Sequence, residues 1–233
     1  MIATGWPYPD STVTEVIDLA NENSICSTLD GFPIEAAEAT GDFIFHLFPL
    51  ICGGIRKPNP VISECHLAWG PNGLQNNKII DLLTPRAGAA SVTIGKNLQH
   101  DKLWITGGSD GSSELKSTEV IDILSNPPTV TYGVDLPIAA GGHCLVKMGP
   151  IYDASGIWFM SRRYTSFYNI EAGSWSQGPD MINERSLFGC GIMKMDNGSE
   201  IIVAAGGIRS KTTTEFLSLD SGSGLRWTPG RKE

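Results

Sequence analysis

The chain has 233 residues and a formal net charge of −8, with 41% hydrophobic and 18% charged residues. An acidic chain without a lysine-rich run is not expected to bind nucleic acid, and no window holds the ~18 unbroken apolar residues that a membrane span requires. Glycine (27 residues) and proline (14 residues) are abundant, which favours many short elements joined by turns.

The first two units of the chain carry the same two strand motifs. Residues 2–5 read IATG and residues 14–19 read TEVIDL, while residues 50–54 read LICGG and residues 63–67 read SECHL. Each apolar run ends in glycine, which adopts positive φ without a steric penalty. Each following run alternates apolar and polar side chains, which predicts a half-buried strand. Because IATG has the character of a second strand, the first unit is expected to lack its first strand.

The third unit has the same order with its first strand in place. Residues 87–95 (AGAASVTIG) predict that first strand, and residues 103–108 (LWITGG) predict a buried second strand ending in a glycine pair. Residues 118–123 (TEVIDI) predict an alternating third strand. A weaker fourth strand is expected near Thr131, so one unit consists of four short strands.

The fourth and fifth units vary this order. The run IWFMSRR at 157–163 has Ser-Arg where the other units have two glycines, whereas IIVAAGG at 201–207 keeps the pair. Trp175 and Trp227 mark the fourth strands of these two units. The chain stops at the last of these strands, so the fifth unit is also expected to be incomplete.

Two markers recur about every fifty residues, so the chain is an internal repeat. A unit of four short antiparallel strands has two faces to cover and cannot cover them alone. Neighbouring units are therefore expected to stack radially, as in a β-propeller. The approximate units are 1–35, 36–85, 86–137, 138–184 and 185–233. The glycine-pair marker falls at Gly5, Gly53, Gly107, Ser161 and Gly206, and the third-strand marker at Glu15, Glu64, Glu119, Ser166 and Glu215.

An apolar run, a glycine pair, an alternating third strand and a tryptophan, repeated at about fifty residues, resemble the kelch repeat over essentially the whole chain. Arg86 and Arg185 match the arginine that kelch units often carry ahead of the first strand. The resemblance implies one all-β domain over residues 1–233. That domain would be a kelch-type β-propeller of about five four-stranded blades, the first and last incomplete, or a fragment of a six-bladed propeller. Structural roles are implied for Gly53, Gly54, Gly107, Gly108, Gly206, Gly207, Trp175 and Trp227.

Basic residues collect in the loops that kelch propellers place on one partner-binding face. With Arg86 and Arg185 of the return loops, these loops hold nine of the 17 basic residues of an acidic chain. We therefore expect a protein partner with an acidic segment, because arginine forms bidentate hydrogen bonds with carboxylates. The alternative is that polar loops collect charge in any case and that Arg86 and Arg185 brace the blades. The candidate partner-binding residues are Arg56, Lys57, Arg162, Arg163, Arg209 and Lys211.

The sequence favours a protein-interaction module over an enzyme. The resemblance leaves two alternatives open: the substrate-recognition propeller of a BTB-kelch ubiquitin-ligase adaptor, and a carbohydrate-acting propeller enzyme. No catalytic residue, cofactor or metal site is expected, because no pair of histidines has metal-ligand spacing. The four histidines are scattered over different units, at His46, His66, His100 and His143.

The five cysteines leave the compartment open between extracellular and cytoplasmic. Cys52 and Cys65 lie on neighbouring antiparallel strands, so they form either a cross-strand disulfide or two buried thiols. Cys144 and Cys190 hold matching places in successive units and are expected to be core thiols. The start of the chain has no basic region followed by an apolar stretch, so no signal peptide is expected.

Overall fold

The structure is a computed structural model that describes residues 2–4, 14–16, 27–29, 36–44, 48–56, 60–70, 73–95, 101–148, 156–196, 198–218 and 224–230. Within these ranges the chain forms strands, turns and irregular segments and no helix. The same part of the chain therefore contains no helix that could cross a membrane. The prediction of an all-β fold is confirmed.

The strands form five antiparallel sheets, each from consecutive strands. The first sheet has three strands, β1 (Ile2–Thr4), β2 (Thr14–Val16) and β3 (Ser27–Leu29). The next two contain β4 (Thr40–Ile44), β5 (Phe48–Cys52), β6 (Glu64–Gly70) and β7 (Gly73–Asp81), then β8 (Ala90–Ile94), β9 (Lys102–Thr106), β10 (Thr118–Asp122) and β11 (Thr129–Tyr132). The last two contain β12 (Cys144–Met148), β13 (Gly156–Ser161), β14 (Tyr164–Asn169) and β15 (Ser174–Gln177), then β16 (Gly189–Lys194), β17 (Glu200–Ala205), β18 (Thr214–Ser218) and β19 (Trp227–Pro229).

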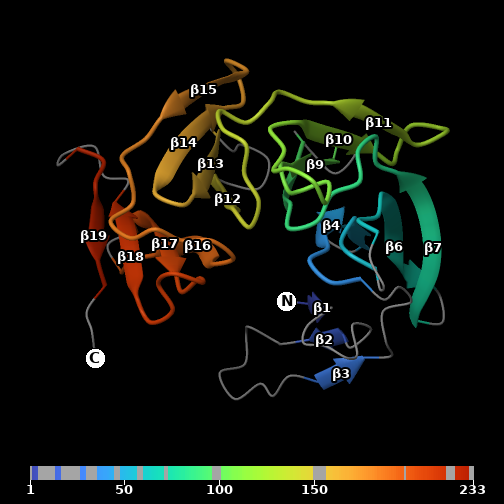
Figure 1. The fold of residues 1–233 in the computed structure, drawn as a ribbon, viewed down its shortest axis with the longest axis horizontal. Coiled ribbons are helices and arrows are strands. Elements are labelled where there is room, and N and C mark those ends of the chain that lie inside the picture. The colour runs from blue at the N-terminus through green and yellow to red at the C-terminus, as the bar shows by residue number, and fades with distance from the viewer. Residues whose placement is uncertain are drawn as a thin grey trace.

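The four four-stranded sheets are arranged as the blades of a propeller around a common axis (Figure 1). Their first strands β4, β8, β12 and β16 lie innermost, and β4 contacts β8, β8 contacts β12 and β12 contacts β16. The expectation of about five four-stranded blades is wrong: the described residues form four. The last blade is also complete, because β19 pairs with β18 as a fourth strand. The short run around Trp227 is enough to form that outer strand.

The blades pack through apolar side chains that alternate along each strand. One buried cluster joins the second and third sheets through Leu50, Cys65 and Ile105, among others. A second cluster joins the last two blades through Trp158, Met160 and Leu217. The side chains of β13 are buried on both faces of the strand, as expected for a strand between two neighbouring blades.

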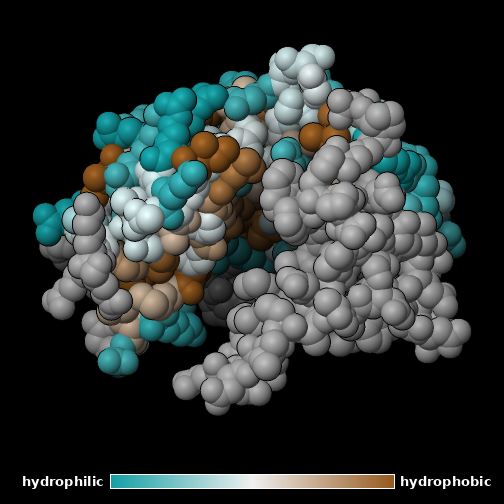
Figure 2. Space-filling model, turned by 60° about the horizontal axis from the view of Figure 1, so that its bottom comes forward, coloured by the Kyte–Doolittle hydropathy of each residue, from teal (hydrophilic) through white to brown (hydrophobic). Residues whose placement is uncertain are grey.

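One face of the last blade differs from the others. Along β17, Ile202 and Ala204 are buried but Ile201 and Val203 are only half-buried. A Cβ atom built on Gly191, which pairs with Val203, would meet no atom within 4 Å. Among the described residues no sheet covers this face. Hydrophobic surface is visible in Figure 2 on the left, where the last blade lies.

Side chains form hydrogen bonds between neighbouring inner strands. Asp42 on β4 accepts a hydrogen bond from the Thr93 amide on β8 at 2.7 Å, and the Thr93 hydroxyl donates to the Phe43 carbonyl at 2.9 Å. Lys147 on β12 donates to the Thr93 carbonyl at 3.0 Å. Burial lowers the pKa of this lysine. These bonds satisfy backbone groups at the inner edge of β8, which sheet pairing leaves free.

The glycine pairs form the joints between blades. Gly54 and Gly108 each donate their amide to a backbone carbonyl of the next blade, those of Arg86 and Ala140, both at 2.8 Å. Arg162 occupies the same place in its blade and donates to the Arg185 carbonyl at 2.9 Å. All three donors have positive φ, between 56° and 103°. The glycines are needed here because a side chain at Gly54 or Gly108 would collide with the neighbouring backbone.

Candidate functional site

Three hydrogen bonds join four residues in an open row where the inner strands begin. Glu38, Gly88, Gly142 and Leu187 each lie two residues before the inner strand of a blade, and all four are left-handed, with φ between 51° and 61°. The Gly88 amide donates to the Glu38 carbonyl at 2.9 Å, Gly142 donates to Gly88 at 2.8 Å, and Leu187 donates to Gly142 at 2.7 Å. We call these four the ring residues.

The loops that follow the second strand of each blade lie beside the ring residues. Antiparallel bridges join Ala37 to Ile55 and Ala87 to Ser109, and a third bridge joins Arg162 to Arg185. Ring residues and loops therefore belong to one surface, which we call the ring face.

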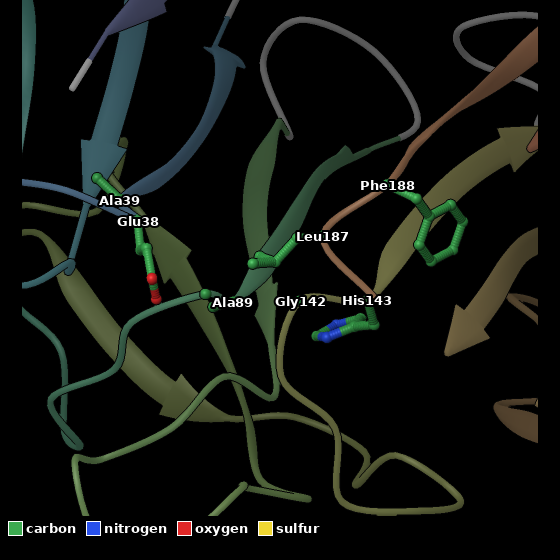
Figure 3. Close-up of a pocket in the computed structure, with 8 residues that line it drawn as sticks. Glu38, Ala39, Ala89, Gly142, His143, Leu187 and Phe188 are labelled. Atoms are coloured by element: carbon green, nitrogen blue, oxygen red, sulfur yellow. The ribbon is translucent and has the colours of Figure 1, made fainter. Parts of the chain in front are cut away.

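A pocket with a volume of about 310 Å³ opens at the centre of the ring face (Figure 3). Each of the four blades contributes its ring residue and the residue after it. Gly88, Ala89 and Gly142 leave room in the middle, whereas Glu38 and Leu187 contribute the longer side chains of the rim. Both of these side chains are exposed. The full lining is Glu38, Ala39, Gly88, Ala89, Gly142, His143, Leu187 and Phe188.

His143 lines the pocket from its buried side. Its Nε2 atom lies 2.7 Å from the Thr106 hydroxyl, and its ring packs on Phe159 with centroids 5.2 Å apart. Nδ1 is buried without a well-aligned hydrogen bond, although the backbone of Ala140 nearby favours protonation. Burial dominates and lowers the pKa of His143 to about 4. The imidazole is therefore neutral at pH 7 and adds no charge to the pocket.

Replacing His143 with glutamine is expected to make the fold less sensitive to acid. Between pH 6.5 and about 4 the unfolded chain binds a proton at this residue and the folded chain does not, so stability falls as the pH falls. The loss reaches about 3 kcal/mol near pH 4. Urea unfolding of both proteins across this range measures the difference, and parallel losses would contradict the assignment.

Three of the candidate partner-binding arginines are already ion-paired. Arg56 contacts the carboxylate of Glu64 at 2.6 Å, and this hydrogen bond lowers the pKa of Glu64. Arg162 reaches across to Glu114 of the neighbouring blade at 2.8 Å. Arg209 contacts Glu184 at 3.3 Å. The acidic partners offset the positive charge expected for this face.

The other three candidate residues are placed differently from one another. The guanidinium Nε of Arg163 donates to the carbonyl of Met181 at 2.9 Å. Lys211 is exposed in the loop between β17 and β18. Lys57 lies outside the described residues. The described candidate residues all lie between the second and third strands of their blades, in loops of the ring face: Arg56, Arg162, Arg163, Arg209 and Lys211.

Arg86 and Arg185 are wholly buried, so they cannot contact a partner. Arg86 donates to the carbonyls of Gly107 and Ser117, at 2.7 and 2.9 Å, and pairs with Glu119 at 2.5 Å. That carboxylate also accepts hydrogen bonds from the amides of Leu83 and Thr84. The inclusion of these two arginines in the partner-binding face was wrong, and the bracing alternative is correct.

The last blade repeats this arrangement, although Arg185 pairs through Nε where Arg86 uses a terminal guanidinium nitrogen. Arg185 donates to the carbonyls of Gly206 and Thr213, at 2.7 and 2.8 Å, and pairs with Glu215 at 2.7 Å. Glu215 accepts from the amides of Ile182 and Asn183. Each arginine lies in the segment that leads into a blade, and its ion pair with the glutamate on the third strand holds that segment against the blade.

The two tryptophans fasten the outer strands in a similar way. The Trp175 indole donates to the Asp135 carbonyl at 2.9 Å, and Trp227 donates to the Pro179 carbonyl at 3.0 Å. Both acceptors lie in the segment that enters the blade of the donor. Trp175 also packs on Trp104 and Tyr168, with ring centroids 6.0 and 5.0 Å away.

Four of the cysteines form two pairs at disulfide distance. Cys52 and Cys65 lie opposite each other on β5 and β6, with Cα atoms 4.0 Å apart, so they are placed as the disulfide alternative predicts. Cys144 and Cys190 join β12 to β16, with Cα atoms 6.2 Å apart. The expectation that this second pair are core thiols is wrong, because innermost strands of neighbouring blades approach closely at the axis.

The described residues contain no group of three or more histidine, cysteine, aspartate or glutamate side chains that could hold a metal ion. His66 on β6 lies 3.2 Å from Glu64, and His143 lies beneath the ring. His46 and His100 fall outside the described residues.

The pocket residues were missed by sequence reasoning, although a signal was present. In each blade the ring residue lies two positions ahead of the inner strand, and in two blades this residue is glycine. Aligning the four units at that position places Glu38 and Leu187 beside the two glycines. A charged residue and a large apolar residue at a position that is glycine in other units indicate that their side chains have a role in the pocket.

No known protein-family description matches the chain, and no curated protein matches it. Among solved structures, 161 chains match. One of them, the structure of YjhT, superimposes with a TM-score of 0.66 over 94% of this chain and 91% of that chain, at 13% sequence identity. A likeness at this identity shows the fold alone, and it supports the propeller architecture.

Proposed function

We propose that the chain is a protein-interaction module that binds its partner through the ring face. Propellers commonly act as interaction scaffolds, and loops on a rigid scaffold are where binding residues concentrate. The observation that carries the proposal is the convergence of a central pocket with exposed, ion-paired loops on one face. The scaffold beneath them is held by the buried Arg86–Glu119 and Arg185–Glu215 pairs.

The finer parts of the proposal come from the sequence. We propose a kelch-type propeller because the sequence repeats about every fifty residues. We propose a binding role rather than catalysis because the histidines are scattered over different units. The two cysteine pairs favour an oxidising, extracellular setting, because disulfides persist in such compartments. The same pairs argue against the ubiquitin-ligase adaptor alternative, which acts in a reducing compartment.

Charge reversal of Arg162 and Arg163 is expected to abolish partner capture. Arg162 is 55% exposed in its side chain and offers its guanidinium to solvent beside Glu114. Charge reversal would remove this hydrogen-bond donor. It would also place glutamate side chains against the acidic segment of the partner, and this like-charge contact lowers the affinity. Affinity capture with the tagged chain, followed by quantitative mass spectrometry, would compare wild type with the Arg162→Glu/Arg163→Glu variant.

The matched control for Arg162→Glu is Lys194→Glu, which also reverses a single charge, at the end of β16 remote from the ring residues. Because Arg163 also donates to the Met181 carbonyl, Arg162→Glu alone separates lost binding from lost folding. A partner retained by the control and lost from both ring-face variants supports the proposal. The same set of proteins captured by every variant would contradict it.

A further inference from the structure

We propose that the pocket at the centre of the ring face accepts one basic side chain of the partner, with the Glu38 carboxylate as its counter-ion and Leu187 as its apolar wall. The inference rests on the proposed function and names the chemistry of the partner's anchor residue. It differs from the acidic segment expected on the surrounding loops, because it concerns only the pocket.

The charges around the pocket favour a cation inside it. Among the described residues Glu38 forms no ion pair, whereas Arg56, Arg162 and Arg209 are each paired with a glutamate. His143 is neutral at pH 7 because burial lowers its pKa. The carboxylate of Glu38 is therefore the charge left unmatched among the lining residues. A guanidinium or ammonium group is its natural complement.

The shape of the pocket suits the stem of a long basic side chain. Leu187 is 52% exposed at the rim, and Ala39, Ala89 and Phe188 line the walls. Lysine and arginine bury their methylene stems against apolar surface while the charged head finds a polar partner. Figure 3 shows Glu38 and Leu187 on separate segments of the chain, with Ala89 between them. One side chain can contact both.

The backbone at Glu38 and Leu187 gives independent support. Both residues hold the left-handed conformation, at φ of 56° and 51°, that Gly88 and Gly142 supply in the other two blades. Side chains with a Cβ atom disfavour this conformation. Glycine at either place would keep the ring hydrogen bonds without that strain. Strained residues of this kind concentrate at binding sites, where the side chain is needed.

The test is a titration of the full chain followed by NMR at the amides of Gly88 and Gly142. The probes are the N-acetyl, N-methylamide derivatives of arginine, lysine, citrulline and glutamate. Citrulline has the shape of arginine without its charge. We expect saturable shifts with arginine and lysine and none with citrulline or glutamate. Glu38→Gln is expected to weaken binding by about tenfold or more, since a charge-assisted hydrogen bond is lost.

A second variant separates binding from folding. Glu38→Gly removes the same carboxylate and also relieves the backbone, so it is expected to lose arginine binding while raising the midpoint of thermal unfolding by about 2 °C. Leu187→Gly is expected to do the same with a smaller loss of binding. A rise in stability together with lost binding cannot come from a damaged fold.

Equal shifts with citrulline and arginine, or arginine binding unchanged in Glu38→Gln, would overturn the inference. Partner capture distinguishes this failure from failure of the proposed function. If Glu38→Gln still captures the partner that the Arg162→Glu variant loses, the ring face binds and the pocket is not the anchor site. If no variant of the ring face changes capture, the proposed function itself fails.

Discussion

Replacing Glu119 with glutamine is expected to destabilise the protein by about 3–5 kcal/mol, the cost of leaving one member of a buried ion pair uncompensated. Arg86 and Glu119 are both fully buried, and the carboxylate also accepts the amides of Leu83 and Thr84. The substitution keeps the shape of the side chain and removes its charge. Urea unfolding followed by tryptophan fluorescence measures the change.

Two comparisons make this result interpretable. Glu114→Gln breaks the exposed pair with Arg162 and is expected to cost less than about 1 kcal/mol. The double variant Arg86→Met/Glu119→Met should remain destabilised, because the Gly107 and Ser117 carbonyls and two amides lose their partners. A Glu119→Gln protein within about 1 kcal/mol of wild type would show that the pair does not hold the blade.

Removing the disulfide between neighbouring blades is expected to cost about 4 kcal/mol, because Cys144 and Cys190 close a loop of 46 residues. The pair within one blade, Cys52 and Cys65, closes only 13 residues and is expected to cost about 3 kcal/mol. Serine double variants of each pair, compared by urea unfolding, test this order. The reverse order would mean that chain entropy does not dominate.

Thiol counting checks that the bonds form. With both pairs oxidised, one of the five cysteines remains free in the denatured, unreduced chain, and that one is Cys26. Alkylation followed by mass spectrometry should therefore add one label before reduction and five after it. Five labels before reduction would also remove the support for an oxidising compartment.

The buried ion pairs Arg86–Glu119 and Arg185–Glu215 explain how repeats of differing sequence share one architecture. Where the bracing arginine is replaced by Ala140, the third-strand glutamate is replaced by Ser166, so neither charge is left buried alone. In the blade that begins at Ala36, Glu64 is kept but pairs with Arg56 of its own loop. The repeat therefore conserves charge balance inside each blade more closely than it conserves residue identity.

Strand order and strand type could be read from the sequence, because both are local properties. The alternation in TEVIDI at 118–123 and the glycine pair at 107–108 act within a few residues of themselves, and β9 and β10 form where these motifs predict them. Blade number was overestimated for the same reason. A motif such as IATG at 2–5 predicts a strand but does not say how many strands will pair with it, and β1 belongs to a three-stranded sheet.

By itself, then, the sequence determined an all-β chain of repeated four-stranded units, because side-chain alternation and glycine placement act over a few residues. Only the tertiary structure decided that Arg86 is buried rather than exposed, that Cys144 reaches Cys190, and that Glu38 and Leu187 share a pocket. Each of these depends on residues tens of positions apart meeting at the axis or at a joint between blades, and only the stacking of the blades brings them together.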